Sequence, residues 1–278
     1  MPLPTPQTEA GRAGLAALLD NPRQALIGLD FDGTLAPIVA EPDQARGHPG
    51  VRPVLERLSA LVGRLAVITG RPAEVAVDYG GLRGIPGLTV LGHYGLERWT
   101  EGRLSAPPAS EAVEAVRRRL PALLEAVGAP PGTAVEDKGR SVAVHVRRTA
   151  DPAAALAVVE GPLRELAAEV GLAVEPGRMV LELRPPGADK GGALRTLVAE
   201  ARPSAVVFIG DDLGDLAAFE AVDELRTEGV PGLLVCSGST EETALADRAD
   251  LVVDGPPGVV ALLEALADEL SPDRRPGR

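Results

Sequence analysis

The sequence predicts an α/β protein in which a doubly wound, Rossmann-like parallel sheet forms the core and a smaller α+β cap domain is inserted into it. Short uncharged runs alternate with helical patterns near both ends of the chain, which is the βαβ order of a parallel sheet. Over roughly residues 105–185, helices instead alternate with antiparallel-style strands. Proline pairs at both ends of this middle segment indicate hinges.

These patterns predict a core in two pieces, a cap between them and a tail at each end. The predicted ranges are an N-terminal tail over 1–21, a core over 22–103 and 186–270, a cap over 104–185 and a C-terminal tail over 271–278.

Three buried strands are expected in the first piece of the core. The apolar run that starts at Ala25 carries no charge for five or six residues, as a strand buried on both faces does. Similar runs follow at 65–68 and 89–91. Helices are expected over 10–19, over 51–62 and from Pro72 onward, since proline often opens a helix.

The remaining elements follow from the same periodicities. In the cap we expect helices over 110–127 and 152–170, a strand or hairpin over 133–147, and strands over 172–175 and 179–183. The α/β order then resumes with helices over 189–201, 216–225 and 258–270 and strands over 205–209, 232–236 and 251–253.

Composition narrows the class of protein. The 278 residues carry a net charge of −12 and only six aromatic residues, so nucleic acid is not an expected partner. A single cysteine, Cys236, excludes a disulfide within the chain and fits a cytoplasmic protein. The chain has no 18-residue apolar span and does not start with a basic region followed by an apolar one. We therefore expect a cytoplasmic protein with no membrane partner.

The first buried strand ends in two aspartates, Asp30 and Asp32, followed by Gly33 and Thr34. The carboxyl ends of parallel strands are where open α/β sheets bind ligands. Two neighbouring carboxylates repel each other unless a cation lies between them or one is protonated. This pattern predicts a hard divalent ion such as Mg²⁺, although an Asp-Gly turn alone would explain the same four residues.

Three further segments place chemically useful side chains at the same predicted edge of the sheet. Thr69 and Arg71 follow the second strand, and Asp211, Asp212 and Asp215 follow the strand over 205–209. Lys190 lies in the first turn of a helix, where backbone N–H groups also attract anions. The chain has 26 arginines but only two lysines, Lys138 and Lys190, which makes both lysines candidates for a specific role.

Together these groups contain what phosphoryl transfer needs. There is a carboxylate nucleophile, a second carboxylate as acid and base, a hydroxyl and an ammonium for phosphate oxygens, and acidic ligands for a metal. The chain has no GxxxxGK[ST] loop, and no GxGxxG follows the first strand. A P-loop nucleotide hydrolase and a dinucleotide-binding protein are therefore excluded.

The four motifs resemble those of the haloacid-dehalogenase-like phosphatases. More narrowly, residues 22–268 resemble the trehalose-6-phosphate phosphatase family. The narrower resemblance rests on the stretches 69–71, 135–138, 145–147, 181–185 and 189–191.

The resemblance implies roles for individual residues. It implies catalysis by Asp30, Asp32, Thr69 and Lys190, substrate binding by Gly33, Thr34, Gly70, Arg71, Glu136, Lys138, Arg147 and Glu182, and Mg²⁺ binding by Asp30, Asp32, Asp211, Asp212 and Asp215. It also implies a small-molecule sugar phosphate as substrate, a monomer, and a functional link to a trehalose-6-phosphate synthase. The roles of His93 and Glu97 stay open, because shaping the junction between the domains would explain their stretch equally well.

One departure from the family pattern leaves alternatives open. The family reads GDDxTDE at its last motif, whereas this chain has Gly214 and Leu216 at the threonine and glutamate positions. The enzyme could act on a related sugar phosphate, such as sucrose phosphate, a mannosyl phosphoglycerate or a trehalose-like pseudodisaccharide phosphate. A non-catalytic sugar-phosphate-binding protein is the alternative from another class.

Overall fold

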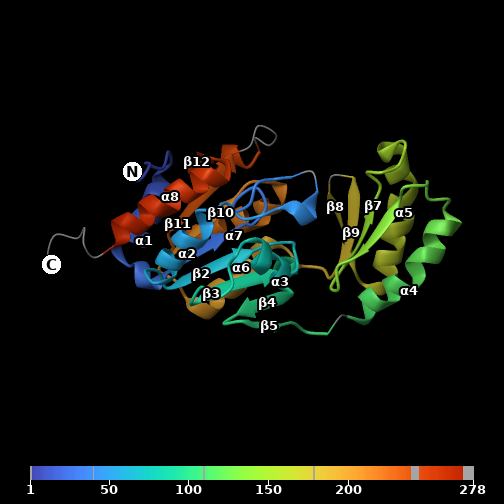
Figure 1. Ribbon diagram of the computed structural model, residues 1–278, viewed down its shortest axis with the longest axis horizontal. Coiled ribbons are helices and arrows are strands. Elements are labelled where there is room, and N and C mark those ends of the chain that lie inside the picture. Colours follow the sequence, from blue (N-terminus) through green and yellow to red (C-terminus); the bar gives the residue numbers. More distant parts are fainter. Residues whose placement is uncertain (1, 40, 109, 178, 239–243, 272–278) are drawn as a thin grey trace. The chain divides into compact units, whose positions relative to one another are not determined.

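A computed structural model describes residues 2–39, 41–108, 110–177, 179–238 and 244–271. The chain folds as two compact units, a larger one made of Met1–Ala106 and Asp189–Arg278 and a smaller one made of Pro107–Ala188. Figure 1 shows both, coloured along the chain. Among the described helices, none has the length and apolar character that crossing a membrane requires.

The larger unit is built on an eight-stranded sheet with the order β12-β11-β10-β1-β2-β3-β4-β5. The strands from β12 to β3 are parallel, and β4 and β5 pair antiparallel at one edge. In that order their bounds are Leu251–Asp254, Gly232–Gly238, Ala205–Gly210, Ala25–Leu29, Arg64–Ile68, Leu88–Gly92, Glu97–Thr100 and Arg103–Ser105. This arrangement confirms the predicted doubly wound parallel core.

Helices cover both faces of this sheet (Figure 1). One face packs against α1 (Glu9–Asp20), α2 (Val51–Ser59), α3 (Ala73–Tyr79) and α8 (Gly255–Leu270), and the other against α6 (Lys190–Ala201) and α7 (Leu216–Thr227). In β1, Ile27 and Leu29 point into the first layer and Leu26 into the second. Burial on both faces explains why this strand reads as an unbroken apolar run.

The antiparallel pair β4 and β5 was not predicted from the sequence. In β4 only alternate residues are buried. Its one large apolar residue is Trp99, of which only 1% is exposed. A four-residue strand with one aromatic residue and two charges gives little local signal. Its place in the sheet comes from pairing with β3.

Helix α1 falls within the stretch that the sequence predicts as an N-terminal tail. It packs closely against β11 and β10. A side-chain carbon at Gly14 would lie only 2.0 Å from the carbonyl oxygen of Gly232, so the helix backbone lies directly on the strand. The predicted C-terminal tail over 271–278 lies, apart from Ser271, outside the described residues.

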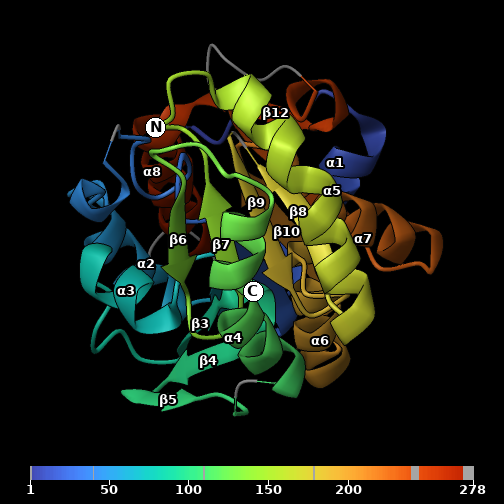
Figure 2. The ribbon, with the colours of Figure 1, turned by 90° about the vertical axis from the view of Figure 1, so that its right-hand side faces the viewer.

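The smaller unit contains a four-stranded antiparallel sheet with the order β6-β7-β9-β8. Its strands are Ala134–Asp137, Val142–His145, Val180–Arg184 and Ala173–Gly177. Helices α4 (Glu111–Ala126) and α5 (Pro152–Val170) lie over one face (Figure 2). That face supplies Val142, Val144, Leu181 and Leu183 to the apolar core. The predicted α+β composition is thereby confirmed, and the segment 133–147 is a hairpin.

Asp250, buried just before β12, ties α1 to the sheet, and its removal should destabilise the larger unit. Its carboxylate accepts hydrogen bonds from the Thr8 hydroxyl, the Arg226 guanidinium and the Leu234 N–H. Asp250→Ala leaves the half-buried Arg226 without this partner, so we expect a loss of about 3–5 kcal/mol in unfolding free energy. Asp223→Ala removes the exposed partner of the same Arg226 and should cost at most about 1 kcal/mol. Urea denaturation measures both, and equal losses would contradict this assignment.

Candidate active site

Four of the side chains predicted to act in catalysis or metal binding lie at the carboxyl edge of the parallel strands of the larger unit. Asp30 follows β1, Thr69 follows β2, Asp211 follows β10, and Lys190 is the first residue of α6. All four are buried, with at most 5% of their surface exposed. This is the edge at which open α/β sheets bind ligands.

The Lys190 ammonium lies between two buried carboxylates. Its Nζ is 2.5 Å from Oδ1 of Asp30 and 2.7 Å from Oδ1 of Asp215. Asp189 caps the same helix, since its carboxylate accepts a hydrogen bond from the Gly192 N–H at 2.7 Å. A buried ammonium needs such charged partners, because desolvation alone would be costly.

Asp30, Asp211 and Asp215 form a carboxylate cluster in which one oxygen of each lies within 4.8 Å of the others. When all three are ionised, three negative charges face one lysine, and the cluster then carries an excess of negative charge. The buried Oδ1 of Asp211 has no hydrogen-bond donor within the described part of the chain. Oxygen ligands with excess negative charge fit a hard divalent cation.

The pKa values of these side chains reflect their burial and the short distances between their charges. Burial raises the pKa of Asp30 well above its usual value, against the opposing charge of Lys190. Burial, with Asp212 and Asp215 nearby, raises the pKa of Asp211 to about 7. For Lys190, burial lowers the pKa, but Asp215 and Asp30 outweigh burial and raise it above its usual value. The metal-free cluster therefore favours protonated carboxyls, a preference that a bound cation reverses.

Asp212 and Asp215 were both predicted as metal ligands, yet their surroundings differ. Asp215 is fully buried, and its second oxygen, Oδ2, accepts hydrogen bonds from the backbone N–H groups of Asp211 and Asp212. Asp212 is exposed, and its Oδ1 accepts a hydrogen bond from the Gly214 N–H. Asp212 lies outside the buried cluster, and the hydrogen bonds of Asp215 hold Lys190 and the loop.

The two departures from the family motif lie beside this loop. A side-chain carbon at Gly214 would approach Oδ1 of Asp212 to 3.0 Å. Leu216 begins α7. The hydrogen bonds of Asp215 with Lys190 and with the backbone of Asp211 and Asp212 involve neither of these two residues.

Gly33 brings the first loop against Asp211. Its φ of +78° is in the left-handed region, and a side-chain carbon there would lie 1.9 Å from Oδ2 of Asp211. The Ser237 hydroxyl donates to the Gly33 carbonyl at 2.6 Å. Thr34 beside it is fully buried. Ser237 was missed from the sequence, although its place near the carboxyl end of β11 was a usable signal.

The second motif aspartate, Asp32, lies in a different environment from Asp30. Its side chain is 40% exposed and forms a two-pronged ion pair with Arg71, with both contacts at 2.7 Å. For Arg71, burial lowers the guanidinium pKa, but the contact with Asp32 outweighs it and raises the pKa. The Thr69 hydroxyl accepts a hydrogen bond from the Arg71 N–H at 3.1 Å.

The stretch 93–97, left open from the sequence, supports the loop that carries Thr69, Gly70 and Arg71. The N–H of His93 donates to the Arg71 carbonyl at 2.9 Å, and the N–H of Tyr94 donates to the Thr69 carbonyl at 3.0 Å. A side-chain carbon at Gly70 would lie 2.6 Å from the Tyr94 hydroxyl oxygen. Glu97 accepts a hydrogen bond from the Ala73 N–H, at the start of α3.

In the smaller unit, the predicted sugar-binding side chains lie on and beside the sheet. Glu136 of β6 and Glu182 of β9 are both in register with Ala143 of β7, so they share one face. Lys138 donates to Glu182 at 2.9 Å, and the Ser141 hydroxyl donates to the same carboxylate at 2.5 Å.

Two further side chains, His145 and Arg147, lie at and just beyond the end of β7. His145 lies 2.8 Å from Glu136. Arg147 is exposed beyond the end of β7. Ser141 and His145 were not predicted as site residues.

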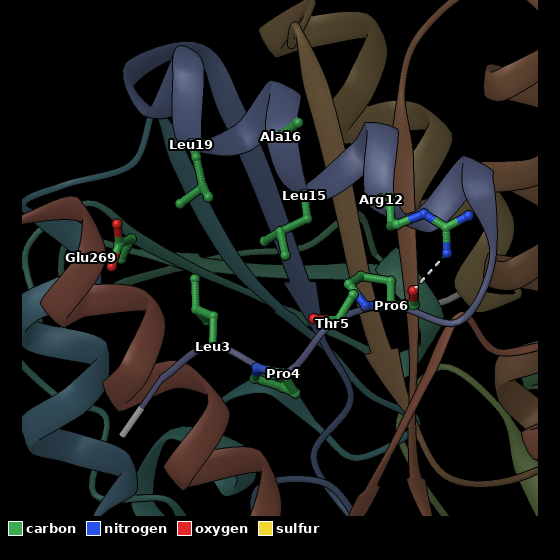
Figure 3. Close-up of a pocket in the computed structure, with 9 residues that line it drawn as sticks. All are labelled: Leu3, Pro4, Thr5, Pro6, Arg12, Leu15, Ala16, Leu19 and Glu269. Carbon is green, nitrogen blue, oxygen red and sulfur yellow. Dashed lines mark hydrogen bonds between the residues drawn. The ribbon is translucent and has the colours of Figure 1, made fainter.

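A separate hollow of about 340 Å³ lies between the N-terminal segment, α1 and α8 (Figure 3). Leu3 points toward Leu15 and Leu19 of α1, and Arg12 donates to the Pro6 carbonyl at the rim. The hollow contains none of the predicted site residues. It is therefore distinct from the carboxylate cluster.

Solved structures support the fold. The chain aligns with Candida albicans trehalose-6-phosphate phosphatase C-terminal domain at a TM-score of 0.73, with 22% identity over 96% of this chain and 99% of that one. The Aspergillus fumigatus trehalose-6-phosphate phosphatase gives a TM-score of 0.71, with 22% identity over 95% and 99%.

Relatives found by sequence similarity are also trehalose-phosphate phosphatases. The trehalose-phosphate phosphatase of Mycobacterium avium is 34% identical over 275 residues, which is 94% of this chain and 65% of that protein. The Mycobacterium leprae protein of the same name is 32% identical, over 91% and 60%. The chain thus spans less than two thirds of the length of these relatives. The family model for trehalose-phosphatase matches residues 28–253, and with the motif residues gathered at one sheet edge, this chain belongs to the trehalose-phosphatase family.

Proposed function

We propose that this chain hydrolyses trehalose 6-phosphate to trehalose and phosphate through an aspartyl-phosphate intermediate. The observation that carries the proposal is the buried Asp30 carboxylate, which contacts Lys190 beside Asp211 and Asp215. Asp32 lies two residues further on with a partly exposed side chain. A nucleophile and a separate acid and base group are the two parts that phosphoryl transfer through an aspartate needs.

The chemistry then divides between the two aspartates. An Asp30 oxygen attacks phosphorus as the bond from phosphorus to the sugar oxygen breaks, and Asp32 gives that oxygen a proton. Asp32 next takes a proton from the water that attacks the aspartyl-phosphate, which releases phosphate and restores Asp30. Thr69 and Lys190 bind the phosphate oxygens. Preorganised donors of this kind stabilise the charge that develops in the transition state.

We propose Mg²⁺ as the cation of the carboxylate cluster. The excess negative charge and the buried Oδ1 of Asp211 support this. Asp30 and Asp211 would hold the ion, with the Asp32 backbone carbonyl as a further ligand, while Asp215 keeps Lys190 in place. When bound, the ion would neutralise phosphate charge and polarise the phosphoryl group. Asp212, which is exposed, is the weakest candidate in the set predicted from the sequence.

We propose that the smaller unit acts as the cap and recognises the sugar. Glu136 and Glu182 can accept hydrogen bonds from sugar hydroxyls, and Lys138 and Arg147 can donate them. The small residue Ala143 lies between the two glutamates in the strand register. Charged groups on one sheet face suit a polyhydroxyl ligand.

A phosphate-release assay across disaccharide monophosphates tests the substrate. We expect trehalose 6-phosphate to give the highest kcat/KM. A higher kcat/KM for sucrose phosphate or a mannosyl phosphoglycerate would reassign the substrate, and binding without any release would support a regulatory protein.

Asp30→Asn should abolish hydrolysis while the fold survives. The amide keeps the size of the side chain but cannot attack phosphorus, and the expected loss is at least about a thousandfold in kcat. Asp78→Asn, which alters an exposed aspartate paired with Arg83, is the control and should leave kcat within about twofold. Steady-state kinetics with thermal denaturation of each protein makes the comparison. Full activity in a folded Asp30→Asn protein would exclude the aspartyl-phosphate mechanism.

Without metal, the larger unit should become more stable as the pH falls from 8 toward 5.5. The Asp211 carboxyl has a pKa of about 7 when folded against a usual 3.8, so the folded state binds this proton more tightly. Proton binding by Asp211 therefore stabilises the folded state. This stabilisation is fully present below pH 3.8 and is lost as the pH rises through about 7.

Urea denaturation of EDTA-treated protein at several pH values measures this dependence. The Asp211→Asn protein should give a shallower slope, and Mg²⁺ should weaken the dependence in the wild type. The same slope in wild type and Asp211→Asn would contradict the assignment.

Changes in the smaller unit should affect the sugar substrate alone. Lys138→Ala and Glu182→Gln should each lower kcat/KM for trehalose 6-phosphate by about ten- to a hundredfold, since each removes a charge-assisted hydrogen bond. Hydrolysis of p-nitrophenyl phosphate should stay within about twofold. Arg164→Ala, in an exposed ion pair on α5, is the control for both substrates. A parallel fall with both substrates would show that these residues support the fold or the chemistry instead.

A further inference from the structure

The Arg71 guanidinium forms a bidentate ion pair with the Asp32 carboxylate. Nε contacts Oδ2 and Nη2 contacts Oδ1, each at 2.7 Å. Two parallel N–H···O bonds of this kind fix both the distance and the plane of the carboxylate. The sequence predicted Arg71 as a substrate-binding residue, whereas its side chain here has a protein partner.

Two aromatic rings also lie close to this guanidinium. Its central carbon lies 5.7 Å from the centre of the Phe31 ring and 5.5 Å from the centre of the Tyr79 ring. A guanidinium within about 6 Å of a ring centre is attracted to the ring face. The chain has only six aromatic residues, and two of them contact this one side chain. Movement of Arg71 toward another ligand would break both contacts.

The backbone beneath Arg71 is also held in place. Its carbonyl accepts a hydrogen bond from the His93 N–H at 2.9 Å. His93 and Tyr94 have φ angles of +46° and +58°, which are uncommon for residues with bulky side chains. Strained backbone of this kind persists where the surrounding structure determines it, often at functional sites. The turn therefore sets the position from which Arg71 reaches Asp32.

We propose that Arg71 is a positioning residue that orients the Asp32 carboxylate for proton transfer, and that it does not bind the phosphate. This inference rests on the phosphatase function proposed above. Asp32 has a side chain that is 40% exposed, so without Arg71 it would sample several rotamers. Proton transfer requires the carboxyl within hydrogen-bond reach of the leaving oxygen. The pair with Arg71, whose side chain is only 16% exposed, would restrict Asp32 to one orientation.

Two aryl phosphates with different leaving groups test the proposal. Phenol is a weaker acid than p-nitrophenol, so phenyl phosphate depends more on a proton from Asp32. We compare kcat/KM, which reports the steps up to release of the aryl alcohol. Arg71→Ala should lower kcat/KM for phenyl phosphate by about ten- to a hundredfold, and for p-nitrophenyl phosphate by less than about threefold. Asp32→Asn should likewise lower kcat/KM more for phenyl phosphate than for p-nitrophenyl phosphate.

A double-mutant cycle separates action through Asp32 from direct binding. If Arg71 acts through Asp32, the Asp32→Asn/Arg71→Ala protein should match Asp32→Asn within about twofold. Arg71→Lys keeps the charge but loses the planar fork, and it should recover little activity toward phenyl phosphate. Inhibition by inorganic phosphate should change by less than about twofold in Arg71→Ala. Arg83→Ala, which breaks an exposed ion pair with Asp78, should leave all these quantities unchanged.

The contrary result is equally specific. Equal losses with both aryl phosphates, additive effects in the double mutant, and weaker inhibition by inorganic phosphate would assign Arg71 to the phosphate and overturn the proposal. Thermal denaturation checks folding, and Arg71→Lys supplies the comparison if Arg71→Ala does not fold. If no disaccharide phosphate is hydrolysed but the aryl pattern holds, the trehalose assignment fails while the role of Arg71 stands.

Discussion

The buried contact between the Lys190 ammonium and the carboxylates of Asp30 and Asp215 organises the larger unit. A charge removed from water needs charged partners and hydrogen bonds. Here Asp30 directly follows β1, and Asp215 lies in the loop after the neighbouring strand β10. Asp215 also accepts hydrogen bonds from the backbone of Asp211 and Asp212. One set of contacts therefore positions the start of α6, the end of β1 and the loop after β10.

This contact also explains how an acidic protein can offer a site to an anion. The chain carries a net charge of −12, and Asp30, Asp211 and Asp215 add local negative charge. Lys190 balances only part of it, and the cation proposed for the cluster would supply the rest. The local field at the site can then oppose that of the whole protein. Without metal, burial together with this crowding of negative charge raises the carboxyl pKa values, to about 7 for Asp211.

Two aspartates separated by one residue have different surroundings, and this difference suits them to different tasks. Asp30 is buried against a lysine, whereas Asp32 is partly exposed and paired with an arginine. Asp30 and its partner Lys190 lie on different segments from Arg71, the partner of Asp32. The turn over 93–95 supports the second loop by two backbone hydrogen bonds. Placing carboxyl groups in unlike environments is how a site assigns them distinct roles.

The sequence by itself determined the parallel sheet, the inserted α+β segment and the edge at which the motif residues meet. Apolar runs, helical periodicity and the residues that follow each strand are local properties. The tertiary structure decided the partner of Arg71, the supporting roles of Ser237 and Ser141, the docking of α1 and the edge strands β4 and β5. It also separated buried Asp215 from exposed Asp212, although both belong to one short motif. These features depend on contacts between residues far apart in the chain or on the turn of a single loop, and packing sets such contacts without leaving a local pattern.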